Sequence, residues 1–181
     1  MLKPSLLVLV ACAMLNAQQT RREIVNPAPT PEGDAKPNSD KVPDVYSIKT
    51  QFDRVEIWRF KFGTDLLDAI QRTVRTEKIK NAVILAGAGS VRSYQVHQVS
   101  NREFPSKNTF VKDPTAPADL ISMNGYVING SVHAHMTLAT PEHAFGGHLE
   151  PGTNVFTFAI VTVGILNDAA DLSRVDDKTY R

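Results

Sequence analysis

The chain has 181 residues, of which 42 % are hydrophobic and 22 % are charged, and its formal net charge is +1 at pH 7. This apolar content excludes a chain that is disordered throughout, and the length comfortably allows one domain. Because 20 basic residues are balanced by 19 acidic ones, the chain has no bulk positive charge that would attract nucleic-acid phosphates.

The first 17 residues are typical of an export signal. Lys3 precedes an apolar run over 6–15, and Ala17 is a small residue suited to cleavage. The run is too short for a membrane span, which needs roughly 20 apolar residues. Acylation of Cys12, the single cysteine, is the alternative reading of this segment as a lipoprotein signal. We therefore expect an exported protein, periplasmic or secreted, whose mature chain has no net charge because Lys3 leaves with the signal.

The composition then divides the remaining chain into three parts. Residues 18–44 contain five of the eleven prolines and few large apolar residues, which predicts an extended, solvated linker. A folded domain is predicted over 45–167. The charged segment 168–181 is predicted to be a tail.

Within the predicted domain, β-branched and aromatic residues favour strands over 45–48 and 54–60. Thr64 is suited to cap a helix, and apolar residues at helical spacing predict one amphipathic helix over 65–78. We expect five further strands, over 82–86, 90–99, 120–128, 131–139 and 155–166. The predicted connections are a glycine turn at 87–89, a long excursion over 100–117, a hairpin turn at Asn129–Gly130 and a loop over 140–152. One helix and about seven strands predict an α+β domain around a mainly antiparallel or mixed sheet.

Four of the five histidines lie within 16 residues: His133, His135, His143 and His148. Because side chains alternate along a strand, His133 and His135 point to the same face of the sheet. The apolar side chains between them point to the opposite face, which is expected to form the core. Gly146–Gly147 gives the backbone freedom to return His148 to the same place. Three neutral imidazoles suit Zn²⁺, and also Fe, Ni or Cu²⁺, and they leave a position open for water or substrate. The sequence predicts a metal site here, with ordinary surface histidines as the alternative.

The spacing does not assign the other polar groups near this motif. Glu142 or Glu150 could serve as a fourth ligand or as a proton acceptor, and His143 is expected at an exposed loop tip. His97 is expected to be an ordinary histidine on a strand face. The sequence has no Gly-x-Ser-x-Gly motif for a serine nucleophile and no complete phosphate-binding glycine loop.

Residues 125–149 resemble the PPC (plants and prokaryotes conserved) domain family. The hallmark of that family is a strand with His-x-His, then a turn, then Gly-Gly-His-Leu, which here is residues 146–149. Gly63-Thr64-Asp65-Leu66, the glycine-rich stretch 86–91 and the stretch 120–125 resemble further elements of the family. The resemblance covers roughly residues 45–167.

The resemblance implies a compact α/β domain that associates as a homotrimer. In prokaryotic members the motif histidines hold a zinc-like ion, which here implies His133, His135 and His148 as ligands of zinc or another divalent transition metal. A small-molecule site at the trimer interface would agree with this resemblance. The resemblance does not imply a particular enzymatic reaction. Plant members carry AT-hooks and act on DNA, but this chain has no Arg-Gly-Arg-Pro hook, which disfavours nucleic acid as a partner. A non-catalytic, DNA-binding or regulatory protein is the alternative function.

Overall fold

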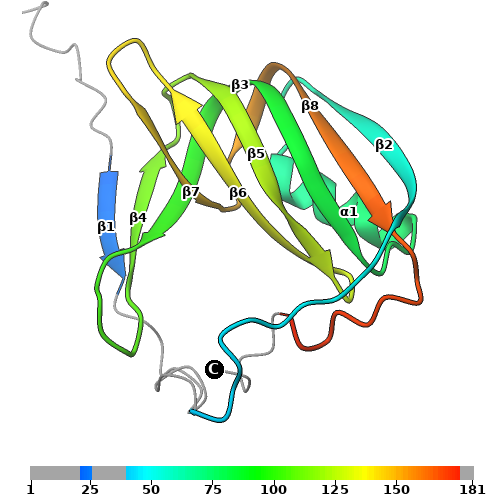
Figure 1. Ribbon diagram of the computed structural model, residues 1–181. Coiled ribbons are helices and arrows are strands. Elements are labelled where there is room, and N and C mark those ends of the chain that lie inside the picture. Colours follow the sequence, from blue (N-terminus) through cyan, green and yellow to red (C-terminus); the bar gives the residue numbers. More distant parts are fainter. Residues whose placement is uncertain (1–20, 26–39, 176–181) are drawn as a thin grey trace, which may run out of the picture.

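The computed structural model of the protein describes residues 21–25 and 40–175. The predicted export signal lies outside the described residues, as does most of the predicted linker. Eight strands and one helix make up the described part: β1 (Arg21–Val25), β2 (Phe52–Lys61), α1 (Leu66–Thr76), β3 (Ala82–Val99), β4 (Asn108–Asp113), β5 (Ala118–Ile128), β6 (Ser131–Ala139), β7 (Ala144–Leu149) and β8 (Asn154–Leu166). The strands belong to a single sheet, which curves strongly around the core (Figure 1).

The long strand β3 organises this sheet because it pairs with four others. Its first half lies between β5 and β8, and its second half lies between β4 and β7. Strand β6 in turn joins β5 to β7. The strands β3, β5, β6 and β7 therefore close into a hydrogen-bonded ring, while β2 extends the sheet beyond β8 and β1 extends it beyond β4.

Helix α1 lies behind the sheet in Figure 1 and supplies one side of the core. Its cap is Asp65, one residue after the predicted Thr64, and the Asp65 carboxylate accepts a hydrogen bond of 3.1 Å from the Asp68 backbone N–H. Leu66, Ile70 and Val74 are at most 1 % exposed, as the helical spacing of apolar residues predicted. They pack with the inward-facing residues of the strands in one hydrophobic cluster.

The α+β prediction is wrong: in the part of the chain that the structure describes, one 11-residue helix accompanies eight strands, and every strand pair is antiparallel. The protein is therefore a mainly antiparallel β structure. Three segments expected to lie outside the sheet contain strands, since β1 lies within 18–44, β4 lies within 100–117 and β7 lies within 140–152. Residues 45–48, by contrast, form no strand.

Gly87–Gly89 does not turn the chain as expected but continues β3. A Cβ atom at Gly89 would lie 2.2 Å from the Phe158 carbonyl oxygen, and the residue has a φ of +150° that L side chains rarely adopt. Glycine here allows β8 to approach β3 closely, which is why the residue interrupts an apolar strand without ending it.

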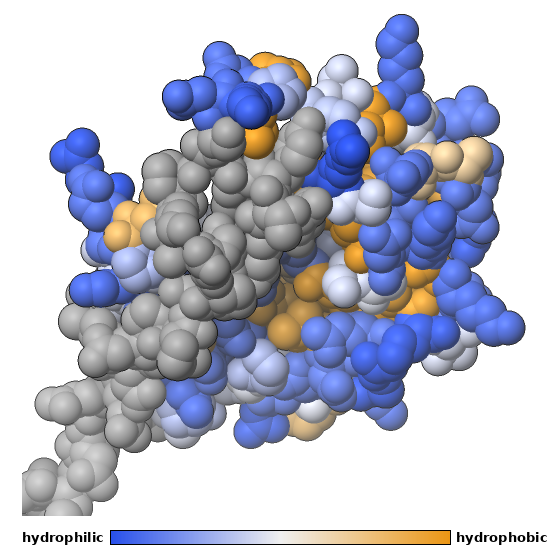
Figure 2. Space-filling model, turned by 90° about the horizontal axis from the view of Figure 1, so that it is seen from below, coloured by the Kyte–Doolittle hydropathy of each residue, from blue (hydrophilic) through white to orange (hydrophobic). Residues whose placement is uncertain are grey.

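Seen from below, the surface is mostly hydrophilic, with smaller hydrophobic areas between the polar side chains (Figure 2). Among the described residues, no helix has the length and apolar character needed to cross a membrane.

Candidate metal centre

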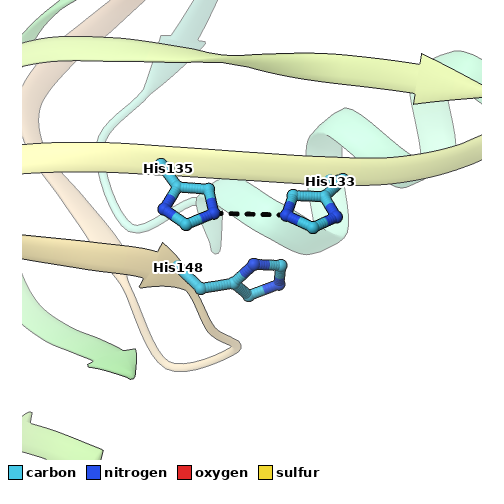
Figure 3. Close-up of side chains that lie close together, drawn as sticks. All are labelled: His133, His135 and His148. Atoms are coloured by element: carbon cyan, nitrogen blue, oxygen red, sulfur yellow. Dashed lines mark hydrogen bonds between the residues drawn. The ribbon is translucent and has the colours of Figure 1, made fainter. Parts of the chain in front are cut away.

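His133 and His135 lie on β6 and point away from the core. The residues between and beyond them, Ala134, Met136 and Leu138, are at most 3 % exposed. This alternation is the one predicted from the sequence, and it places both imidazoles on the outer face of the closed ring of strands. Their Nε2 atoms are 3.2 Å apart and form a hydrogen bond (Figure 3).

His148 reaches the same place from the neighbouring strand β7. It is the direct cross-strand partner of His135 in the antiparallel β6–β7 pair, and directly opposed residues have Cβ atoms about 4.5–5.5 Å apart. The strand pairing, rather than a flexible loop, therefore brings the third imidazole to the first two. Figure 3 shows the His148 ring turned toward the two rings of β6.

The two glycines before His148 have a different role from the expected one. A Cβ atom at Gly146 would lie 2.1 Å from the Met136 carbonyl oxygen, and one at Gly147 would lie 2.3 Å from the His97 carbonyl oxygen. Both distances are far below a van der Waals contact, so a side chain at either residue would push β7 away from β6 or β3. The Gly-Gly pair permits this close strand packing and thereby fixes the position of His148.

The three rings are spaced as ligands of one cation would be. The ring centroids are 5.3 Å apart for His133–His135, 4.8 Å for His133–His148 and 5.2 Å for His135–His148. One nitrogen from each ring can be chosen so that all three lie within 4.8 Å of one another. Two nitrogens bound to one Zn²⁺ at about 2.0–2.1 Å are about 3.3–3.4 Å apart in tetrahedral geometry, close to the 3.2 Å between the β6 nitrogens. The donor set and its spacing therefore fit a zinc-like ion.

The electrostatics of the site favour a neutral imidazole at His135. Partial burial lowers the pKa of His135 below its usual value, and repulsion from the nearby His133 and His97 lowers it further. A neutral ring keeps the lone pair that a metal needs, so His135 is prepared to bind a cation near neutral pH.

His97, which was expected to be an ordinary strand histidine, adjoins the site. It is the cross-strand partner of His148 in the β3–β7 pair, and the two rings stack with centroids 4.6 Å apart. The His97 Nδ1 atom is 2.6 Å from Glu150 Oε1, and all three side chains are half-buried. The row Asn124, His135, His148, His97 and Phe110 thus crosses five neighbouring strands in register.

The structure also separates the two glutamates that the sequence left undecided. Glu150 lies beside His97, whereas Glu142 is exposed in the turn between β6 and β7, where its backbone N–H donates to the Thr140 hydroxyl. His143 is exposed as expected, and its ring lies 5.4 Å from that of Phe145. Neither Glu142 nor His143 belongs to the groups of described residues that could hold a metal.

The comparison with protein families gives a match to the Plants and Prokaryotes Conserved (PCC) domain over residues 48–167. None of the curated proteins compared with the chain matches it.

Several solved structures share the fold. A metal-containing protein from Archaeoglobus fulgidus is 20 % identical, with a TM-score of 0.58 over 75 % of this chain and 95 % of the other. A plant- and prokaryote-conserved (PPC) protein from Pyrococcus horikoshii is 25 % identical, with a TM-score of 0.55 over 68 % and 85 %. A hypothetical protein from Salmonella is 23 % identical, with a TM-score of 0.54 over 62 % and 78 %. With the family match spanning 48–167, the chain belongs to the Plants and Prokaryotes Conserved domain family.

Proposed function

We propose that this chain binds one divalent transition-metal ion, zinc or a similar ion, through His133, His135 and His148. The observation that carries this proposal is the convergence of three imidazoles from two paired strands, with one nitrogen of each ring within 4.8 Å of the others and the two β6 nitrogens 3.2 Å apart. The Archaeoglobus fulgidus protein of similar fold is a metal-containing protein, which supports the proposal.

The residues around the site suit this binding. The β6–β7 pairing orients His135 and His148, and the lowered pKa of His135 keeps that ring available. With three protein ligands, such an ion keeps one position for water or a small molecule and can lower the pKa of bound water.

The proposal is tested by metal analysis of the full-length protein, purified without chelators. We expect close to one equivalent of a divalent metal per chain. A chain that holds no metal, and that binds no added Zn²⁺ or Co²⁺ in calorimetry, would contradict the proposal.

We propose further that the protein is a homotrimer. The family resemblance suggests this assembly, and an exposed apolar band on β2 and β8 supports it. The band is formed by Val55, Ile57, Phe156, Phe158 and Ile160. Residues Ile57, Phe158 and Ile160 lie on the outer side of the β2–β8 pair, which helix α1 does not cover. Apolar surface of this kind favours contact with another protein chain.

We also propose that the protein is exported, on the strength of the signal-like residues 1–17. Sequencing the N-terminus of the protein from its native host tests this. The mature chain should begin near Gln18 or at an acylated Cys12, and an intact Met1 in cytoplasmic protein would contradict export.

A further inference from the structure

A second set of metal-binding groups overlaps the first. His97, His148 and Glu150 offer one ligand atom each within 4.8 Å of one another. Two imidazoles with one carboxylate is a ligand set found in catalytic zinc sites and in mononuclear non-haem iron sites. The set therefore has the right chemistry for a divalent cation, and none of its members except His148 belongs to the site proposed above.

The strand pairing also positions the second set. His97 and His148 are direct partners in the β3–β7 pair, and Glu150 follows His148 by two residues on the same face. The Glu150 backbone N–H donates to the Gln95 carbonyl oxygen at 3.1 Å, so strand-like pairing with β3 continues through Glu150. All three side chains are half-buried, which limits the number of positions they can adopt.

Two of these groups form a hydrogen bond, in which His97 Nδ1 lies 2.6 Å from Glu150 Oε1. With a carboxylate as the acceptor, His97 donates this bond from Nδ1. A cation that entered between them would bind Nδ1 and Oε1, and the ring proton would move to Nε2 by exchange with solvent. Metal binding at this position would replace that hydrogen bond with bonds from His97 and Glu150 to the ion.

We propose that His97, Glu150 and His148 form a second, overlapping position for a divalent transition metal. The proposal rests on the proposed function in one respect, since both positions use His148. A neutral imidazole has a single free lone pair, so His148 serves one cation at a time and each chain holds one ion. The carboxylate makes the second position the harder of the two, which suits Zn²⁺, Fe²⁺ or Mn²⁺.

The test removes the first position and asks whether metal still binds. The protein is the full chain with Cys12→Ser, so that no thiol contributes, stripped of metal and titrated with Zn²⁺ and Mn²⁺ in a calorimeter. The His133→Asn/His135→Asn double variant should still bind one equivalent of Zn²⁺, about 10- to 1,000-fold more weakly than the parent. Adding Glu150→Gln or His97→Phe should weaken this residual binding by at least about tenfold, as expected for loss of a ligand.

One control variant makes the result specific. Adding His143→Asn to the double variant should leave the residual binding unchanged, because His143 lies outside both sets. Circular dichroism checks folding, and His133→Gln/His135→Gln is the replacement pair if the asparagine pair does not fold.

The outcomes separate the two proposals. Metal binding by the parent but none by the folded double variant would overturn the second position and leave the first intact. If neither Glu150→Gln nor His97→Phe weakens the residual Zn²⁺ binding of the double variant, the second position is overturned as well. A parent that binds no metal would contradict the proposed function itself.

Discussion

His97 and His148 face each other across β3 and β7, with their rings stacked at a centroid distance of 4.6 Å. These residues are 51 positions apart in the sequence, and the antiparallel register alone brings them together. The contact makes His97 unsuitable as a control for mutations in the metal site. His143, which is exposed and lies outside both ligand sets, is the appropriate control.

Gly147→Ala should weaken both the fold and the metal site. The new Cβ atom would lie 2.3 Å from the His97 carbonyl oxygen, so β7 must move away from β3 and carry His148 with it. We expect a loss of about 1–3 kcal/mol in the free energy of unfolding, typical of overpacking, together with lower Zn²⁺ affinity. Urea denaturation and calorimetry measure the two effects.

The matched control is Gly130→Ala in the β5–β6 turn. Its φ of +78° should cost about 1–2 kcal/mol of stability, but a Cβ atom there meets only the Ile79 carbonyl oxygen at 4.0 Å. Zn²⁺ affinity should be unchanged in this variant. Equal loss of affinity in both glycine variants would show that the effect is general destabilisation.

The stability of the metal-free protein should fall as the pH is lowered through the range in which His135 titrates. Its pKa is lowered in the folded state from the usual 6.5, so between the two values the unfolded chain binds more protons at this residue. The contribution of His135 to stability is therefore complete above about pH 6.5 and is lost as the pH falls toward the lowered pKa.

Urea denaturation in the presence of a chelator, at pH 7.5 and pH 5.5, measures this effect. His135→Asn should reduce the difference in unfolding free energy between the two pH values, and His143→Asn should not. A pH dependence that is the same in His135→Asn and in the unchanged protein would contradict the assignment to His135.

Phe158→Glu should disrupt the proposed trimer. Phe158 is 40 % exposed on β8 within the apolar band, and a carboxylate there would lose its hydration in an interface, a cost that the neighbouring Arg59 offsets only in part. Light scattering should give three times the chain mass for the unchanged protein and a smaller mass for the variant. Val45→Glu is the control, because Val45 is 79 % exposed and lies outside the band. A monomer mass for the unchanged protein at micromolar concentration would contradict trimerisation.

The protein should not bind DNA tightly. Its 20 basic and 19 acidic residues provide no excess of positive charge, and DNA binding draws much of its affinity from releasing counterions of the phosphates. A gel-shift assay at 50 and 200 mM salt should show no micromolar complex. A tight complex that weakens steeply with salt would favour the alternative, DNA-binding function.

The sequence identified the histidines of β6 because their orientation depends on a local period. His133 and His135 alternate with Ala134 and Met136, so two neighbours in the chain were enough to assign the face. The helix was found for the same reason, from the spacing of Leu66, Ile70 and Val74.

The missed features depend on pairing between distant segments. Gly89 and Gly147 were interpreted as turn residues, because a sequence does not show which carbonyl oxygen will lie 2–3 Å from a missing Cβ atom. That misreading left β7 as a loop and divided β3 in two. The partnership of His97 with His148 and Glu150 likewise follows from the β3–β7 register. The alternation of Val96, His97 and Gln98 on a predicted strand shows to which face of the strand the His97 side chain points. It does not show which residue lies opposite His97 on the neighbouring strand.

The most direct test of the metal centre is the metal content of four single variants, measured by mass spectrometry after purification without chelators. His133→Ala and His135→Ala should each lower the metal content, because they leave only the weaker position intact, and His148→Ala should lose nearly all of the metal because both ligand sets include it. His143→Ala should keep the content of the unchanged protein, close to one equivalent per chain. If the three variants of the site retain stoichiometric metal, or if the unchanged protein contains none and takes up none, the histidines of β6 and β7 are not a metal centre.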